Sequence, residues 1–252
     1  MFAIKMCVIF FDLVWLKSEI VMSKSSFAGR IVLLIFSLFI LGFHPLSGQN
    51  KHAIGFFPTI DHSGNFTNKW SYNSYNFAAN NIKSNYSTFL YVYTENGLHY
   101  QLHPKLTLSN SFVYERQEPF NPQNRNEYRL FQQLTLKNQW GNVGLKNRFR
   151  IDERWIENTI TNRYQFSTRL RYLIGYQYDL NPKKYITAYT EAFFATNNQF
   201  RFNENWSAVQ IGHRLNAKNS IEIGYLFVSW IYNNNNQWFN QHYLQFTWVN
   251  KL

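Results

Sequence analysis

Hydrophobic and polar side chains alternate along "NVGLKNRFRIDERW", residues 142–155. One set of alternate positions is apolar and includes Val143, Leu145, Phe149 and Ile151. The other set is charged and consists of Lys146, Arg148, Arg150, Asp152 and Arg154. Because successive side chains of a β-strand point to opposite faces, the segment predicts a strand with one apolar face and one charged face.

The same alternation recurs along most of the chain after residue 50, and the connections between the alternating segments also repeat. The tight connections are "FTNKW" (66–70), "LHPKL" (102–106), "WGNV" (140–143), "LNPKK" (180–184) and "LNAKN" (215–219). Longer polar connections fall between them, such as "QEPFNPQNRN" (117–126) and "YNNNNQ" (232–237). Tight turns that alternate with longer loops predict an antiparallel meander.

This pattern predicts an all-β fold, an antiparallel up-and-down transmembrane β-barrel with tight periplasmic turns and longer extracellular loops. Counting from Trp70 gives five hairpins, so we expect about ten strands, within a range of ten to twelve. Aromatic residues stand at the ends of several apolar strand faces, as Tyr128 and Trp140 do. The aromatic girdles at the two membrane interfaces of a barrel have this placement. Residues 52–60 are left open, because an eleventh strand would give an odd count where such barrels normally have an even one. The segment is an extra edge piece, a lumen segment or half of a further hairpin.

A soluble β-barrel or sandwich is the alternative, with the apolar faces pointing inward and the arginines on a solvated outside. The interfacial aromatics, the uninterrupted basic and polar face, and the difference between the two sets of connections favour the membrane barrel.

The first 49 residues predict export. Residues 22–49 have the form of a signal peptide, with Lys24 and Arg30 before an apolar run at 31–43 and Ser47 and Gly48 near the expected cleavage point. Residues 1–21 are interpreted as the result of a start codon assigned too early, with Met22 as the true initiator. A signal-anchor helix is the alternative. Residues 50–252 form the predicted barrel domain. Cys7 is the only cysteine, so we expect neither disulfides nor a lipid-bearing cysteine in the barrel.

The amino-acid composition restricts the classes of binding partner that we expect. The 252 residues carry a formal charge of +11 at pH 7, but the basic residues are spread along the strand pattern, so nucleic acid is not expected. We expect a location in the bacterial outer membrane, with its lipids and lipopolysaccharide as neighbours. The C-terminal "LQFTWVNKL" is similar to the signal that barrel-assembly machinery recognises, and small anionic solutes are possible ligands of a basic lumen.

The polar face defines the candidate functional residues. We expect the lumen to be lined by Lys146, Arg148, Arg150, Asp152, Arg154, Arg169, Arg171, Glu191 and Glu222. Two interpretations stay open. Long paired side chains fill a narrow barrel, or unpaired cations line a constricted pore that favours anions.

Catalysis finds little support in the sequence. No G-x-S-x-G, H-x-x-H or H-E-x-x-H motif is present. We therefore expect no enzyme activity, no catalytic residues, no metal and no cofactor. The expected role is a narrow porin-like channel or a structural envelope protein. The alternative is a lipid-modifying outer-membrane hydrolase with a serine, a histidine and an orienting partner.

Three segments carry a family resemblance: "LKNRFRIDERW", "RLRYLIGYQYDLNPKKYITAYTEAFF" and "LNAKNSIEIGYLF". The chain resembles the domain-of-unknown-function-2490 family of bacterial outer-membrane β-barrels over residues 52–252. Its R-x-R-x-[DE]-x-R strand is matched by Arg148, Arg150, Asp152 and Arg154. An inward arginine resembles Arg169 or Arg171, and an acidic residue resembles Glu191. The resemblance implies a barrel in the outer membrane and no particular activity.

Overall fold

Eleven β-strands and no helix make up the part of the chain described by the computed structural model, residues 51–83, 86–122, 124–197, 200–231 and 238–252. The strands are β1 (Lys51–Asn65), β2 (Trp70–Lys83), β3 (Tyr86–His103), β4 (Leu106–Gln117), β5 (Arg125–Trp140), β6 (Val143–Asn158), β7 (Arg163–Asp179), β8 (Lys184–Ala195), β9 (Arg201–Arg214), β10 (Asn219–Ile231) and β11 (Trp238–Lys251). The predicted signal peptide at 22–49 and the segment 1–21 lie outside the described residues. Nowhere in the described residues is there a helix long and apolar enough to cross a membrane.

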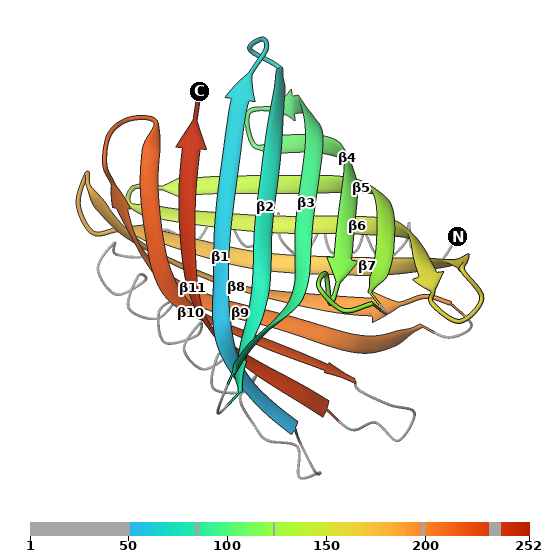
Figure 1. Ribbon diagram of the computed structural model, residues 1–252. Coiled ribbons are helices and arrows are strands. Elements are labelled where there is room, and N and C mark those ends of the chain that lie inside the picture. The colour runs from blue at the N-terminus through green and yellow to red at the C-terminus, as the bar shows by residue number, and fades with distance from the viewer. Residues whose placement is uncertain (1–50, 84–85, 123, 198–199, 232–237) are drawn as a thin grey trace. The chain divides into compact units, whose positions relative to one another are not determined.

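The strands form a closed up-and-down barrel in which each strand pairs with its neighbour in sequence, antiparallel throughout. The barrel closes between β1 and β11, which lie side by side and run parallel (Figure 1). This confirms the predicted all-β up-and-down barrel and the count of about ten strands. It also places residues 52–60 in an eleventh strand. An odd number of antiparallel strands leaves the first and last pointing the same way, so the closing pair must be parallel.

A repeated hydrogen-bond pattern explains the tight connections. Oδ1 of Asn181 accepts bonds from the backbone N–H groups of Lys183 and Lys184 at 2.9 and 2.8 Å. Oδ1 of Asn216 does the same for Lys218 and Asn219, both at 2.8 Å. Such a side chain replaces the backbone acceptor within the turn. We call this end of the barrel the turn end, and the opposite end the loop end.

The connections at the loop end are shorter than the sequence predicts, because the strands extend into segments expected to be loops. Only residues 84–85 separate β2 from β3, and only residues 159–162 separate β6 from β7. The interval at residues 118–124 is the longest. Polar residues at strand ends lengthen the strands here, and composition alone does not distinguish them from loop residues.

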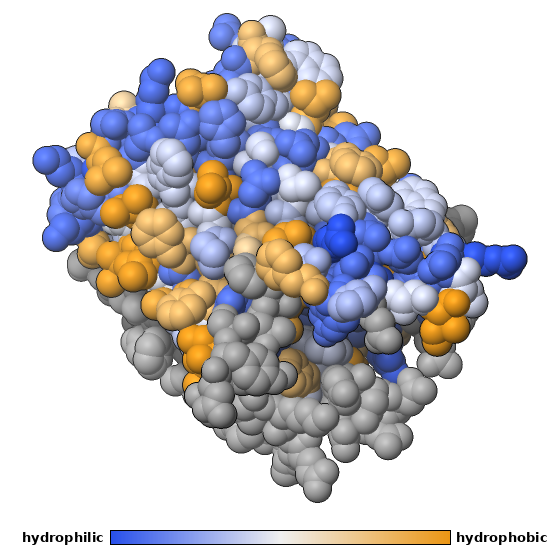
Figure 2. Space-filling view, viewed as in Figure 1, coloured by the Kyte–Doolittle hydropathy of each residue, from blue (hydrophilic) through white to orange (hydrophobic). Residues whose placement is uncertain are grey.

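The outer face of the barrel is apolar and the inner face carries polar side chains. On β11, Leu244, Phe246 and Trp248 are 44–50% exposed, whereas Gln245 and Thr247 between them are 3% and 5% exposed. Exposed hydrophobic side chains recur on most of the other strands and are visible between polar ones on the face shown in Figure 2. This is the reverse of a soluble protein, where the apolar side of a strand is the buried one.

Candidate functional site in the barrel lumen

Aromatic side chains bridge the lumen. Phe57 of β1 stacks on Phe77 of β2 with ring centroids 4.5 Å apart, and Phe77 stacks on Tyr93 of β3 at 4.4 Å. Trp206 of β9 meets Phe57 edge-on at 5.8 Å and Phe77 at 6.1 Å. Because β9 is not adjacent to β1 or β2 in the barrel, these contacts cross the interior. The rings therefore narrow the lumen at this level.

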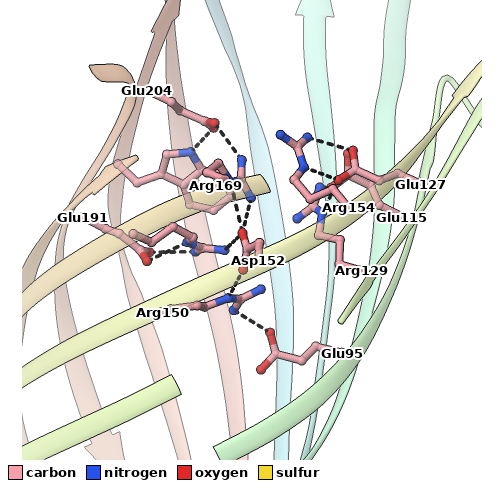
Figure 3. A network of polar contacts seen from close by, with 12 residues as sticks. Glu95, Glu115, Glu127, Arg129, Arg150, Asp152, Arg154, Arg169, Glu191 and Glu204 are labelled. Atoms are coloured by element: carbon pink, nitrogen blue, oxygen red, sulfur yellow. Dashed lines mark hydrogen bonds and ion pairs between the residues drawn. The ribbon is translucent and has the colours of Figure 1, made fainter. Parts of the chain in front are cut away.

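Asp152 is the centre of an arginine network inside the barrel (Figure 3). Its Oδ1 accepts a hydrogen bond from Nε of Arg150 at 2.5 Å, and its Oδ2 accepts bonds from Nε and Nη2 of Arg169 at 3.0 and 2.8 Å. Nη1 of Arg171 lies 3.7 Å from the same Oδ2. The Asp152 side chain is completely buried. A buried carboxylate of this kind is stable only because several cations compensate it.

Three further carboxylates extend the network. Glu191 accepts hydrogen bonds from Arg148 at 2.6 Å and from two nitrogens of Arg171 at 2.8 and 2.9 Å. Nη1 of Arg150 reaches Glu95 at 3.2 Å, and Nη1 of Arg169 reaches Glu204 at 3.2 Å. The contact between β6 and β3 skips the two strands between them, which is possible only through the interior.

A second cluster completes the paired set. Nη2 of Arg129 donates to Glu115 at 2.5 Å, and Nε of Arg129 donates to Glu127. Arg154 donates to both oxygens of Glu127 at 2.6 and 2.9 Å. Such charge-assisted, two-point contacts fix geometry as well as charge.

The two clusters together are electrically neutral. Six arginines face six carboxylates: Arg129, Arg148, Arg150, Arg154, Arg169 and Arg171 with Glu95, Glu115, Glu127, Asp152, Glu191 and Glu204. The arginines also contact the aromatic residues, because the guanidinium of Arg150 lies 3.3 Å from the centroid of Phe131 and that of Arg171 lies 4.3 Å from Phe193. Paired side chains and rings thus occupy the same region of the lumen.

The predicted lumen residues do not all come together. Arg148, Arg150, Asp152, Arg154, Arg169, Arg171 and Glu191 belong to the network. Lys146 lies on the turn-end side of the network, and Glu222 accepts a hydrogen bond from Tyr185 at 2.8 Å. Among the described residues, neither Lys146 nor Glu222 has an ion-pair partner. Sequence reasoning missed Glu95, Glu115 and Glu204 as partners. For Glu95 the available signal was the alternation of residues 86–102, in which Glu95 shares one set of positions with His99 and Gln101, and Leu98 and Tyr100 take the other.

A cavity of about 1690 Å³ occupies the interior. Its lining includes Gln117 and Arg125 at the loop end and Ser63 and Lys251 at the turn end. Eight of the nine predicted lumen residues line it, and Asp152 is buried behind them. The filled region therefore leaves space within the same barrel on both sides of the network.

A serine, a histidine and an asparagine also meet on the inner face. Nδ1 of His99 lies 2.7 Å from Oγ of Ser109, and Nε2 of His99 lies 2.7 Å from Oδ1 of Asn73. His99 and Ser109 are directly opposite on β3 and β4. Because Oδ1 of Asn73 can only accept, Nε2 of His99 donates to it. In the neutral imidazole, Nδ1 of His99 then accepts a hydrogen bond from the hydroxyl of Ser109.

The fold and lumen define a closed all-β barrel with a charged, ion-paired interior. The chain belongs to the family described as "Protein of unknown function (DUF2490)", whose model matches residues 54–240. No curated protein matches the sequence. Among solved structures, the chain is similar to the siderophore receptor PirA from Pseudomonas aeruginosa, with 12% identity and a TM-score of 0.29. The match covers 69% of this chain and 42% of the receptor. A structural similarity at this TM-score says nothing about the function of the chain.

Proposed function

We propose that the protein is a bacterial outer-membrane barrel that is exported by residues 22–49, with the turn end in the periplasm. The observation that supports this is the inverted distribution of side chains, with exposed Leu244, Phe246 and Trp248 alternating with buried polar neighbours. An exterior rich in exposed apolar side chains is stable against lipid and unstable in water. The outer-membrane lipids and lipopolysaccharide are then the partners of this face, and β11 is the strand offered to the assembly machinery.

Fractionation and gel mobility test the location. We expect the protein to require detergent for extraction from the envelope fraction, and to migrate differently before and after boiling because a closed barrel resists denaturation in mild detergent. A protein that stays in solution without detergent would refute the proposal.

Within that membrane, we propose a narrow porin-like channel for small solutes. The single observation that carries this role is the cavity of about 1690 Å³, whose lining includes residues from both ends of the barrel. The aromatic bridge and the neutral network make the passage narrow, and the open space on both sides lets a small solute approach it.

Planar-bilayer recording of the refolded protein tests this role. We expect small, discrete conductance steps, as befits a constricted lumen. A protein that inserts and shows the gel shift but passes no current would instead be a structural component of the envelope.

A lipid-modifying hydrolase is the second candidate, and the contacts of His99 with Ser109 and Asn73 favour it. These are the partners that a serine nucleophile needs, a base and a group that orients the base. Two features weigh against it. The residue Ser109 is only 2% exposed, and it lies within β4, where it pairs with strands on both sides. We therefore propose that the protein is not an enzyme.

Labelling with a fluorophosphonate probe in detergent separates the two candidates. An active serine would be labelled in the wild-type protein and in Ser111→Ala, but not in Ser109→Ala. Ser111 is a matched control because it is also a buried serine of β4, two residues away. We expect no labelling, and labelling that depends on Ser109 would establish the hydrolase.

A further inference from the structure

Two lysines face each other directly across neighbouring strands. Lys137 of β5 and Lys146 of β6 are register partners, and both line the cavity. Like charges in directly opposite positions destabilise a sheet, since their Cβ atoms are only about 4.5–5.5 Å apart. Neither lysine forms an ion pair within the described part of the chain, although carboxylates compensate all six arginines of the network.

A third donor lies one inward position deeper along β6. Nη2 of Arg148 is bound to Glu191 at 2.6 Å, but Nε of Arg148 is buried without a hydrogen-bond partner. Arg148 also lines the cavity. Positive charge and an unused N–H group therefore collect on the wall formed by β5 and β6.

The opposite wall carries charges of both signs. Asp61 of β1, Glu222 of β10 and Lys251 of β11 line the same cavity, and none of them forms an ion pair with Lys137 or Lys146 at 4.0 Å or less. Glu222 is already engaged by Tyr185. Among the described residues, no carboxylate is therefore in direct ion-pair contact with either lysine, which leaves both ammonium groups available to a ligand.

We infer that Lys137 and Lys146, with Nε of Arg148, form a binding site for a small oxyanion in the turn-end half of the lumen. An oxyanion with several oxygens accepts bonds from both ammonium groups and the guanidinium at once, and it neutralises their repulsion. The site lies three residue pairs from the connection at residues 141–142, so a ligand enters it from the turn end. The inference rests on the proposed channel only for this route of entry.

Calorimetric titration of the folded barrel in detergent with inorganic phosphate, at constant ionic strength in chloride, tests the site without any need for conductance. We expect saturable binding by the wild type, at least about tenfold weaker binding by Lys137→Gln or Lys146→Gln, and none by the double variant, because each change removes a charge-assisted contact. Lys218→Gln is the matched control, a cavity lysine on the connection between β9 and β10, and should bind within about twofold of the wild type. Lys137→Arg with Lys146→Arg keeps the charge and checks that a loss reflects charge rather than misfolding.

Absence of phosphate binding, or equal binding by the double variant, would overturn the site. Bilayer recordings then separate the two proposals. Phosphate should reduce the chloride current of the wild type and not that of the Lys137→Gln, Lys146→Gln variant. A protein that binds phosphate through these lysines but passes no current would overturn the channel and retain the site. A protein that conducts and binds no phosphate would overturn the site and retain the channel.

Discussion

Asp152 and Arg169 lie directly opposite each other on β6 and β7, and the Asp152 carboxylate accepts two hydrogen bonds from the Arg169 guanidinium. Asp152 also binds Arg150 and lies near Arg171, so one buried carboxylate is shared by three arginines from two strands. The acidic residue of the R-x-R-x-D pattern allows Arg150 to be buried beside Arg169 and Arg171 of β7. Arg148, the first arginine of the pattern, pairs with Glu191 instead.

Asp152→Asn should destabilise the barrel strongly. The substitution keeps the shape of the side chain but leaves three arginines without their shared charge, and breaking a buried pair in this way costs about 3–5 kcal/mol. Denaturant unfolding in phospholipid vesicles measures the change. The control is Asp179→Asn, which breaks the pair with Arg214 at 2.6 Å, where both side chains are about 30% exposed. That pair should contribute about 0–1 kcal/mol. Equal losses for the two variants would contradict the role assigned to Asp152.

The alternation of β6 was sufficient to predict the faces of the strand. Phe149 and Ile151 are exposed, while Arg150 and Asp152 are buried. Alternation along a strand, however, predicts whether a side chain points inward or outward. It does not predict where the side chain lies along the barrel axis. Glu191 and Glu222 share the inner face, but only Glu191 reaches the arginines. The position along the axis depends on the stagger of the strands, which is a property of the closed barrel and not of any one segment.

Two further features could not be read from the pattern. A single alternating segment such as residues 52–60 does not reveal whether it closes the barrel, because its parallel pairing with β11 depends on the total number of strands. The aromatic bridge was missed for another reason. The inner face was expected to be polar, and Phe57 and Phe77 point inward because charged side chains alone do not fill the lumen beside them.

Phe57→Ala should widen the passage. The ring is fully buried and is the contact between β1 and Trp206, so its removal opens the aromatic bridge. We expect a larger single-channel conductance, together with a loss of about 3–5 kcal/mol of stability from the lost packing. Phe56→Ala is the control, since Phe56 is 49% exposed on the outer face. Its conductance should equal that of the wild type. An unchanged conductance in Phe57→Ala would show that the bridge does not limit the current.

Gly97→Ala should disturb the histidine contacts. A methyl group at Gly97 would overlap with Oγ of Ser111 and with Oδ1 of Asn73, which is the acceptor of His99. Displacing these groups should cost about 1–3 kcal/mol in denaturant unfolding. Gly175→Ala is the matched control on an inner face, because its methyl group would meet nothing closer than 3.4 Å. A stability change within about 0.5 kcal/mol is expected there. If Gly97→Ala is equally silent, Asn73 is not held in the position described.

Engineered cysteines should report the parallel seam between β1 and β11. Thr59 and Thr247 are register partners and both point inward, so Thr59→Cys with Thr247→Cys should form a disulfide on mild oxidation, in a Cys7→Ser background that removes the only natural cysteine. Ser63→Cys with Thr247→Cys is the control. The register partner of Ser63 is Lys251, four residues from Thr247, and about 13 Å along a strand is too far for a disulfide. Mass spectrometry of the unreduced protein distinguishes the products. A bridge in the control pair and not in the first pair would require a different register, whereas no bridge in either would require β1 to lie elsewhere than against β11.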